Sequence, residues 1–278
     1  MKNLTDKQLE AKIQTLQDKT RKLDVFRVYD GEDRVVLSTD AKNNLLLQPK
    51  TPTYFCGLSE IDVAVDGFKG GELVVVSGPT GQGKTTFLQT LTYTFKVKPL
   101  WFSYEVGLED FLERFETLPV FALPQVTQPS NLLWLEQRIW EAKAKYDVKV
   151  VFVDHLHFLL SFDQLMNNSS LAIGHAMREL KRIAIETDTV IFLIAHLQKT
   201  RLEKAPTISD LRDSSFVGQE ADMVFLVWRE VKDIDSIEKY GKDSFLKIEK
   251  NRRKGTLCGF RMKHENKRFK VIAGGNYE

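Results

Sequence analysis

The residues best suited to chemistry lie in the segment SGPTGQGKTTF, at positions 77–87. It follows the apolar run 73–76 and fits the pattern G-x-x-x-x-G-K-[ST] from Gly78 to Thr85. In this pattern the glycines let successive backbone N–H groups converge on phosphate oxygens, and the positive end of the following helix faces the same oxygens. The sequence therefore predicts a nucleotide-phosphate site formed by Gly78, Pro79, Thr80, Gly81, Gln82, Gly83, Lys84, Thr85 and Thr86.

Two oxygen ligands for a cation accompany this site. In the pattern, Lys84 reaches the β- and γ-phosphates and the Thr85 hydroxyl ligates Mg²⁺. Asp154 ends the apolar run VVFVD about seventy residues later, and an unpaired carboxylate buried there would cost several kcal/mol. We therefore expect Thr85 and Asp154 to hold Mg²⁺ together.

Glu105 and His196 each follow another apolar run. In a parallel sheet these positions share the edge that carries ligands, so Glu105 would polarise an attacking water and His196 would sense the γ-phosphate. A purely structural role remains an alternative for both residues. Glu105 could cap or pair ahead of the helix expected at 107–116, and a lone histidine is more often a satisfied polar group.

Composition is that of an ordinary α/β protein. The 278 residues are 42% hydrophobic and 28% charged, with a net charge of +2, which suits one α/β domain plus a short appendage. The apolar run 190–195 is far too short to span a membrane, and the polar start does not resemble a signal peptide. Cys56 and Cys258 have no metal-ligand spacing, so two reduced thiols in a cytoplasmic protein are expected.

The pattern of elements predicts two parts. Residues 1–50 should contain an amphipathic helix at 5–23 and a small hairpin over 24–40 that turns at 30–33. Residues 51–278 should form a mostly parallel, doubly wound sheet, because apolar strands without alternation are covered on both faces. Its expected strands are 73–77, 99–103, 149–153, 190–195 and 223–228, its helices are 84–95, 107–116, 130–146 and 172–187, and antiparallel strands follow in the tail.

Positive charge is concentrated in that tail. Between Lys242 and Lys270 there are eleven basic residues and three acidic ones. Both a solvated surface and a surface that faces a polyanion fit this run.

Several stretches together resemble the motor domain of DnaB-type replicative helicases, including the Twinkle-like branch. They are GELVVVSGPTGQGKTTF, LWFSYEV, VVFVDHLHFL, FLIAHLQK, PTISDLRDSSFVGQEADMVFLVWR and LKIEKNRRKG. The resemblance as a whole runs from about residue 54 to 272, and it adds the replication site of a virus or organelle to the expected locations. The resemblance implies a RecA-like P-loop ATPase core, ATP and Mg²⁺ as ligands, single-stranded DNA as partner, and a homo-oligomer, typically a hexamer.

The resemblance also assigns residues. It gives Glu105 the place of the catalytic glutamate and Asp154 that of the second acidic motif. It makes His196 a counterpart of the glutamine usual in bacterial members, and Lys250 and Arg252 the pair inserted into a neighbouring subunit's ATP site. The residues implied in gripping single-stranded DNA are Arg212, Asp213 and Ser215, although the family commonly has glycine near Ser215.

Two segments are candidate DNA loops, at 161–170 and 199–215. Lys199, Arg201, Lys204 and Arg212 would contact phosphates, and with few aromatic residues nearby the contacts would follow the backbone. The chain has only about fifty residues where relatives carry an N-terminal domain, so contact with a primase or a loader is an open expectation. A recombinase-like ATPase that assembles on DNA without unwinding is the main alternative, ahead of a regulatory scaffold and a small-molecule kinase.

Overall fold

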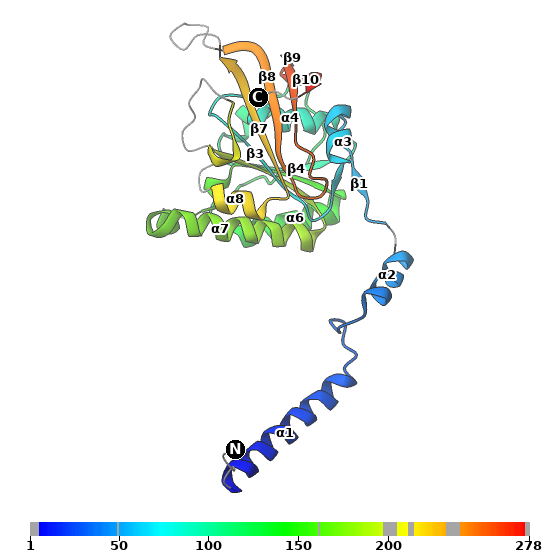
Figure 1. Ribbon diagram of the computed structural model, residues 1–278. Helices are drawn as coiled ribbons and strands as arrows, with labels where there is room; N and C mark the ends of the chain where they lie inside the picture. Colours follow the sequence, from blue (N-terminus) through cyan, green and yellow to red (C-terminus); the bar gives the residue numbers. More distant parts are fainter. Residues whose placement is uncertain are drawn as a thin grey trace. The chain divides into compact units, whose positions relative to one another are not determined.

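Figure 1 shows the computed structural model of the chain, which describes residues 6–48, 50–160, 162–196, 205–210, 214–231 and 240–275. The chain divides into two compact units, Met1–Lys50 and Thr51–Glu278. The first contains helices α1 (Asp6–Arg27) and α2 (Ser38–Leu47).

The helix expected at 5–23 is present and continues to Arg27, but the hairpin expected over 24–40 is wrong. Residues 24–27 are helical, 28–37 form turns without a strand, and α2 begins at Ser38. The apolar side chains that suggested strands, such as Val25, Phe26 and Val28, are all exposed. An isolated two-stranded hairpin is marginal in water without a second layer to cover it, and these residues have no such layer within the unit.

The second unit is built on one large sheet. Its strands, in the described residues, run in the order β10-β9-β8-β7-β3-β6-β5-β4. The bounds are β3 (Leu73–Gly78), β4 (Pro99–Ser103), β5 (Val150–Asp154), β6 (Val190–His196), β7 (Met223–Val231), β8 (Tyr240–Asn251), β9 (Cys258–Glu265) and β10 (Arg268–Gly275). Strands β3 to β7 pair in parallel and β7 to β10 pair antiparallel. The predicted mostly parallel sheet with antiparallel strands in the tail is confirmed.

Helices cover both faces of this sheet (Figure 1). Helices α3 (Ser59–Val65), α4 (Lys84–Thr94) and α5 (Leu108–Glu113) pack on one face. On the other face lie α6 (Leu132–Tyr146), α7 (Phe162–Thr187) and α8 (Ser214–Glu220). Short elements complete the unit: β1 (Thr53–Tyr54), β2 (Phe68–Lys69), and the 3-10 turns η1 (Leu156–Leu159) and η2 (Ile208–Asp210).

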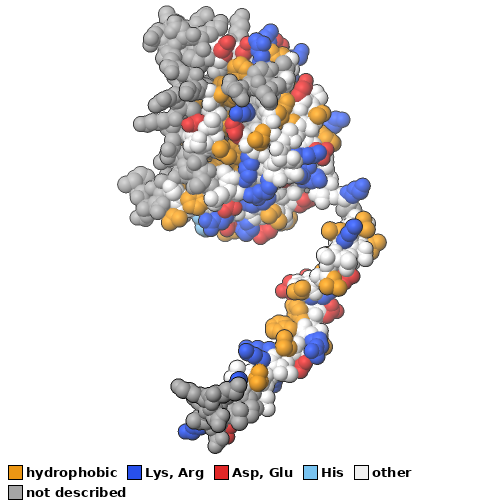
Figure 2. Space-filling view, in the orientation of Figure 1, with side chains coloured by type: hydrophobic (Ala, Val, Ile, Leu, Met, Phe, Trp, Pro, Cys, Tyr) orange, Lys and Arg blue, Asp and Glu red, His pale blue; other side chains and the backbone are white. Residues whose placement is uncertain are grey.

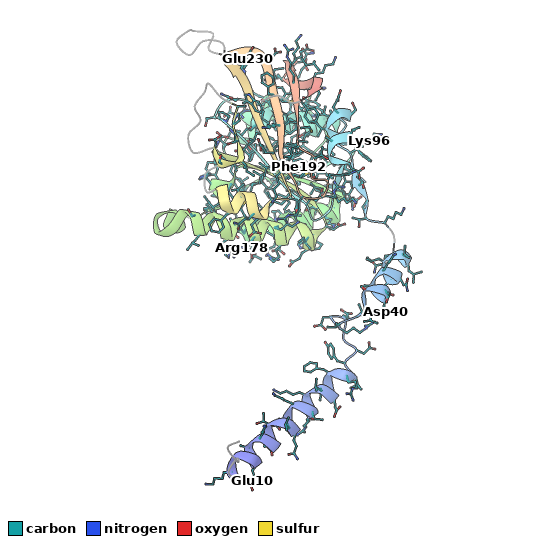
Figure 3. All side chains as sticks on the ribbon, in the orientation of Figure 1. Glu10, Asp40, Lys96, Arg178, Phe192 and Glu230 are labelled. Atoms are coloured by element: carbon teal, nitrogen blue, oxygen red, sulfur yellow. The ribbon has the colours of Figure 1, made fainter. Side chains whose placement is uncertain are left out.

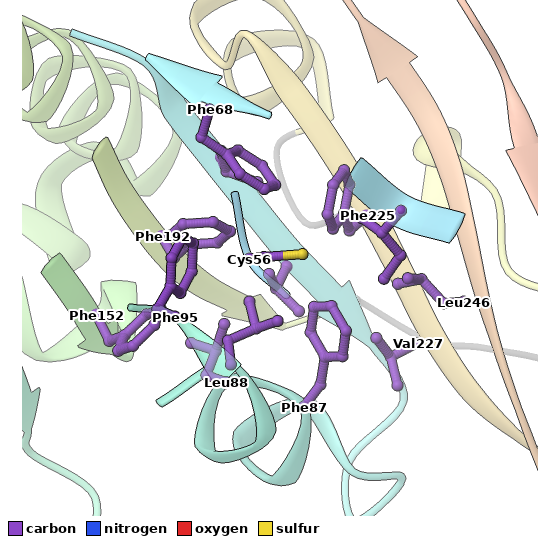
Figure 4. Packing of buried hydrophobic residues seen from close by; sticks show 14 of the residues in the cluster. Cys56, Phe68, Phe87, Leu88, Phe95, Phe152, Phe192, Phe225, Val227 and Leu246 are labelled. Carbon is purple, nitrogen blue, oxygen red and sulfur yellow. The ribbon is translucent and has the colours of Figure 1, made fainter. Parts of the chain in front are cut away.

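An aromatic cluster anchors the α4 face of the sheet (Figure 4). The ring centroids of Phe68 and Phe192 are 5.0 Å apart, and those of Phe152 and Phe192 are 5.4 Å apart. Phe87 reaches this cluster from α4 through Phe225, at 6.3 Å. In Figure 3, Phe192 lies inside the packed unit. Burial of this kind contributes roughly 1.5–3 kcal/mol for each large side chain, and it holds α4 firmly behind the loop that precedes it.

Candidate active site

The loop at 79–83 connects the end of β3 to the start of α4, and the two close approaches that shape it require glycine. Gly78 has φ +150°, and a Cβ there would lie 1.9 Å from the Val227 carbonyl oxygen. Gly83 precedes α4 with φ +99°, and a Cβ there would lie 2.7 Å from the Phe269 ring. The backbone can thus curl at the carboxyl edge of the sheet and present N–H groups to an anion.

Lys84 lies within this loop. The residue is 6% exposed, and Nζ donates hydrogen bonds to the carbonyl oxygens of Gly78 (2.9 Å) and Pro79 (3.0 Å). Burial lowers the pKa of Lys84 to about 8, while the carboxylates of Asp154 and Glu105 act in the opposite direction. The ammonium is therefore poorly solvated, which favours exchange of its carbonyl partners for phosphate oxygens.

Thr85 and Asp154 lie in hydrogen-bond contact. Thr85 Oγ1 donates to Asp154 Oδ2 over 2.8 Å, and Asp154 is only 2% exposed. Its other oxygen, Oδ1, is buried without a hydrogen-bond partner in the described part of the chain. Burial raises the pKa of Asp154 to about 6, the Thr85 hydroxyl opposes that rise, and the Glu105 charge adds to it.

These two oxygens fit a magnesium ion. Mg²⁺ takes oxygen ligands, commonly one or two carboxylates or hydroxyls plus phosphate and water, and a cation would satisfy the orphaned Oδ1. No group of three or more His, Cys, Asp or Glu that could hold a metal occurs in the part of the chain described here. An ion between Thr85 and Asp154 would therefore complete its shell from a nucleotide and water.

Glu105 and His196 come to the same edge of the sheet. Glu105 is exposed two residues beyond β4, whose last residue Ser103 pairs with Asp154. His196 ends β6 and pairs with Gly78. Burial lowers the pKa of His196, and the Lys84 charge lowers it further. His196 Nδ1 is buried without a hydrogen-bond partner among the described residues.

His155 is a neighbour that the sequence did not single out. Its ring meets that of His196 edge to face, with centroids 4.3 Å apart, and its Nδ1 accepts from the His157 backbone N–H at 3.3 Å. Burial lowers the pKa of His155 to about 3, so the ring is neutral and packs against His196 without charge repulsion. The only available signal was its place directly after Asp154.

Lys250 and Arg252 lie at the opposite edge of the sheet. Lys250 pairs with Val224 near the start of β7, and Met223 is level with Val74 of β3. From Val74 to Gly78 the strand advances by roughly 13 Å at about 3.3 Å per residue. The structure therefore separates these two residues from the nucleotide site of their own chain.

Both cations are held at the end of α8. Lys250 Nζ donates to the carbonyl oxygens of Gly218 (2.5 Å) and Ala221 (2.6 Å). Arg252 donates to the Gln219 carbonyl oxygen and, over 3.2 Å, to Asp222 Oδ1. Burial lowers the pKa of Lys250, and the Arg252 charge adds to that effect.

The pattern of the DnaB-like helicase C-terminal domain family matches residues 107–271, more than half of the chain. The chain belongs to this family. A DnaB-like relative from Trieres chinensis, described as a probable replicative DNA helicase, is 22% identical over 260 residues, covering 80% of this chain and 56% of the relative. The replicative DNA helicase DnaB of Mycoplasma genitalium is 26% identical over 242 residues, covering 70% and 51%. The chain spans about half the length of the curated relatives it matches.

Two solved structures share the fold. A DnaB-like replicative helicase, described with its interactions with primase, superimposes with a TM-score of 0.69 at 19% identity, covering 88% of this chain and 68% of that one. A second solved structure, described as an ATPase domain, gives a TM-score of 0.67 at 20% identity, covering 88% of this chain and all of that one. The expected DnaB-type fold is confirmed.

Most residues expected to contact DNA lie outside the described part of this DnaB-like chain, namely Lys199, Arg201, Lys204, Arg212 and Asp213. Ser215 belongs to the first turn of α8. The loop expected at 161–170 is wrong for residues 162–170, which are the first turns of α7. The segment 162–173 contains neither glycine nor proline, so nothing in it ends a helix.

Several basic side chains of the tail contact other residues of the same unit. Arg253 donates to the Val65 carbonyl oxygen at 2.9 Å and pairs with Glu72 at 3.0 Å. Lys267 donates to the Glu113 carbonyl oxygen, and the Arg268 guanidinium lies 3.5 Å from the Tyr93 ring centroid. In the view of Figure 2, basic side chains gather on the lower half of the second unit, where α8 and the end of β8 lie in Figure 1.

Among the described residues, no helix combines the length and the apolarity needed to cross a membrane.

Proposed function

We propose that this chain is the ATP-hydrolysing motor of a replicative DNA helicase, which acts where DNA is replicated. It would hydrolyse ATP at interfaces between copies of itself, move along single-stranded DNA and separate the duplex. The observation that carries this proposal is the position of Lys250 and Arg252, at the edge of the sheet opposite Lys84, Thr85 and Asp154. At that distance they cannot reach the phosphates of their own chain, so any contact they make with a nucleotide would be with that of a second copy.

Within one copy, each residue has a defined task. The loop N–H groups and Lys84 bind the phosphates, and Thr85 with Asp154 would hold Mg²⁺, which neutralises phosphate charge when bound. Glu105 orients a water molecule for attack on the γ-phosphate and accepts its proton. His196, which pairs with Gly78 at the end of β6, contacts the γ-phosphate and so distinguishes the triphosphate from the product.

Between copies, Lys250 and Arg252 complete the site. A guanidinium supplied by a neighbour stabilises the charge of the transition state and is worth about 10³–10⁵ in rate. One surface of each copy would present the phosphate loop and another would present Arg252, so the contact is head to tail. Head-to-tail contacts close into rings or continue as helices; we propose a hexamer, as the DnaB-type resemblance implies.

DNA would bind through the segment that leads into α8. Lys199, Arg201, Lys204 and Arg212 supply positive charge, and Asp213 and Ser215 follow directly. Since Lys250 and Arg252 bind the last carbonyls of α8, this helix joins the proposed DNA segment to the residues that meet the neighbour's nucleotide. A primase or a loader is a further proposed partner, because one structural neighbour is described with its interactions with primase.

The test combines ATP hydrolysis with strand separation. We expect single-stranded DNA to accelerate hydrolysis by the parent chain, the parent to unwind a forked duplex with ATP and Mg²⁺, and Lys84→Ala to abolish both. Hydrolysis that DNA does not alter would contradict the proposal. DNA-stimulated hydrolysis without unwinding would instead favour the recombinase-like ATPase.

A further inference from the structure

Asp222 holds Arg252 by both its backbone and its side chain. The Arg252 backbone N–H donates to the Asp222 carbonyl oxygen at 2.8 Å, and the Arg252 guanidinium donates to Asp222 Oδ1 at 3.2 Å. Asp222 lies between α8 and β7, one residue before the strand that pairs with β8. The arginine is therefore held directly after the end of β8.

The carboxylate is itself fixed to the body of the ATPase. Asp222 Oδ2 accepts from the Leu73 backbone N–H at 2.8 Å and from Lys181 Nζ at 2.6 Å. Leu73 begins the strand that ends in the phosphate loop, and Lys181 lies on α7. Asp222 is buried, and a buried carboxylate with three partners has little freedom to move.

The backbone of Arg252 is hydrogen-bonded within the fold, whereas about half of its side chain is exposed. Its side chain is 51% exposed, against 10% for Asp222, and a guanidinium has five N–H donors. Two of these groups are engaged, by Asp222 and by the Gln219 carbonyl oxygen. The remaining donors have no hydrogen-bond partner among the described residues, and they could meet a phosphate of a second copy.

We propose that Asp222 is a positioning residue for Arg252, fixing the direction from which the guanidinium enters the neighbouring copy's nucleotide site. This inference rests on the proposed function. Because displacement of a catalytic group by about 1 Å can cost about 100-fold in rate, we expect Asp222→Asn to lower DNA-stimulated ATP hydrolysis roughly 10- to 100-fold.

Glu72→Gln is the matched control. Glu72 is 9% exposed, lies one residue before β3 and pairs at 3.0 Å with Arg253, the residue after Arg252. Both substitutions remove one buried negative charge from the same edge of the sheet. Glu72→Gln should hydrolyse ATP at the parent's rate per folded chain, because Arg253 is bound to α3 and not to a neighbour.

Mixing variants separates positioning from mere support of the fold. Asp222→Asn retains an intact phosphate loop, and Glu105→Gln retains an intact Arg252. When these two chains are mixed, we expect DNA-stimulated hydrolysis to exceed that of either alone, while Asp222→Asn mixed with Arg252→Ala should gain nothing.

Three results would overturn the role of Asp222. One is parent-level hydrolysis by Asp222→Asn. Another is failure of Asp222→Asn to gain activity from Glu105→Gln under conditions where Arg252→Ala does gain it. If Arg252→Ala itself hydrolyses ATP at the parent's rate, the shared site is wrong, and the role of Asp222 falls with it.

Discussion

Thr85 Oγ1 donates a 2.8 Å hydrogen bond to Asp154 Oδ2 across 69 residues of sequence. The contact joins the first turn of α4 to the end of β5. It leaves Asp154 Oδ1 buried and without a partner among the described residues. We propose that these two residues form a site for a cation before any nucleotide is bound.

Loss of that carboxylate should remove the contribution of Mg²⁺ to nucleotide binding. We expect Mg²⁺ to tighten binding of a fluorescent ATP analogue to the parent by about tenfold or more, equivalent to ~1.4 kcal/mol, and to have no effect on Asp154→Asn. Anisotropy titrations with Mg²⁺ and with EDTA measure this. An undiminished Mg²⁺ effect in the variant would show that Asp154 does not hold the ion.

Lys84 should make the stability of the nucleotide-free chain depend on alkaline pH. Its pKa falls from 10.5 to about 8 on folding because of burial. Below pH 8 Lys84 is charged in the folded chain, and burial of this charge lowers the free energy of unfolding. Between pH 8 and 10.5 the unfolded chain binds more protons than the folded one, so the free energy of unfolding gains from this group as pH rises.

Lys84→Met should therefore be more stable than the parent at pH 7, by up to about 3 kcal/mol. That advantage should shrink as pH approaches 10.5. Urea unfolding at several pH values measures it, with the exposed Lys96→Met as control. A difference between Lys84→Met and the parent that stays constant with pH would contradict the account.

Two glycines of the phosphate loop should differ sharply in their tolerance of alanine. A Cβ at Gly78 would lie 1.9 Å from the Val227 carbonyl oxygen, whereas a Cβ at Gly81 would meet nothing within 4 Å. Gly81→Ala should cost only about 1–2 kcal/mol for its left-handed backbone. Gly78→Ala should cost more, roughly 3 kcal/mol or above, because two strands must separate. Equal losses in urea unfolding would mean that the close approach of β3 and β7 is wrong.

The consecutive residues Arg252 and Arg253 should have different roles, Arg252 in ATP hydrolysis and Arg253 in the stability of the fold. Arg253 is bound to the carbonyls that end α3 and to Glu72, with a side chain 23% exposed, so Arg253→Ala should lose about 2–4 kcal/mol of unfolding free energy. Arg252 is half exposed, so Arg252→Ala should lose about 1 kcal/mol or less while abolishing hydrolysis. Thermal unfolding and ATPase assays on the two variants give the comparison; a reversed order would refute the assignment.

The sequence was sufficient to predict a strand where burial on both faces determines its residues. Residues 73–76 and 190–195 are apolar at every position because β3 and β6 are covered on both faces, and this pattern predicts parallel strands. The strand preference of Val25, Phe26 and Val28 wrongly predicted a hairpin, because these residues are exposed. The two-residue strands β1 and β2 are too short to leave any pattern.

The phosphate loop could be predicted because its function is fixed by residues adjacent in sequence. The surroundings of Arg252 could not be predicted, since its partner Asp222 is thirty residues away. Their contact depends on the register of β8 against β7, which includes a shift between Val224 and Phe225. No local periodicity encodes such a shift.

The most direct test of a site shared between copies is ATP hydrolysis, with single-stranded DNA present, by a mixture of Arg252→Ala and Glu105→Gln chains. Each chain alone should be inactive. The mixture should be active, because the phosphate loop of the first meets the arginine of the second. If the mixture is no more active than its components, or if Arg252→Ala alone matches the parent, catalysis does not take place between copies.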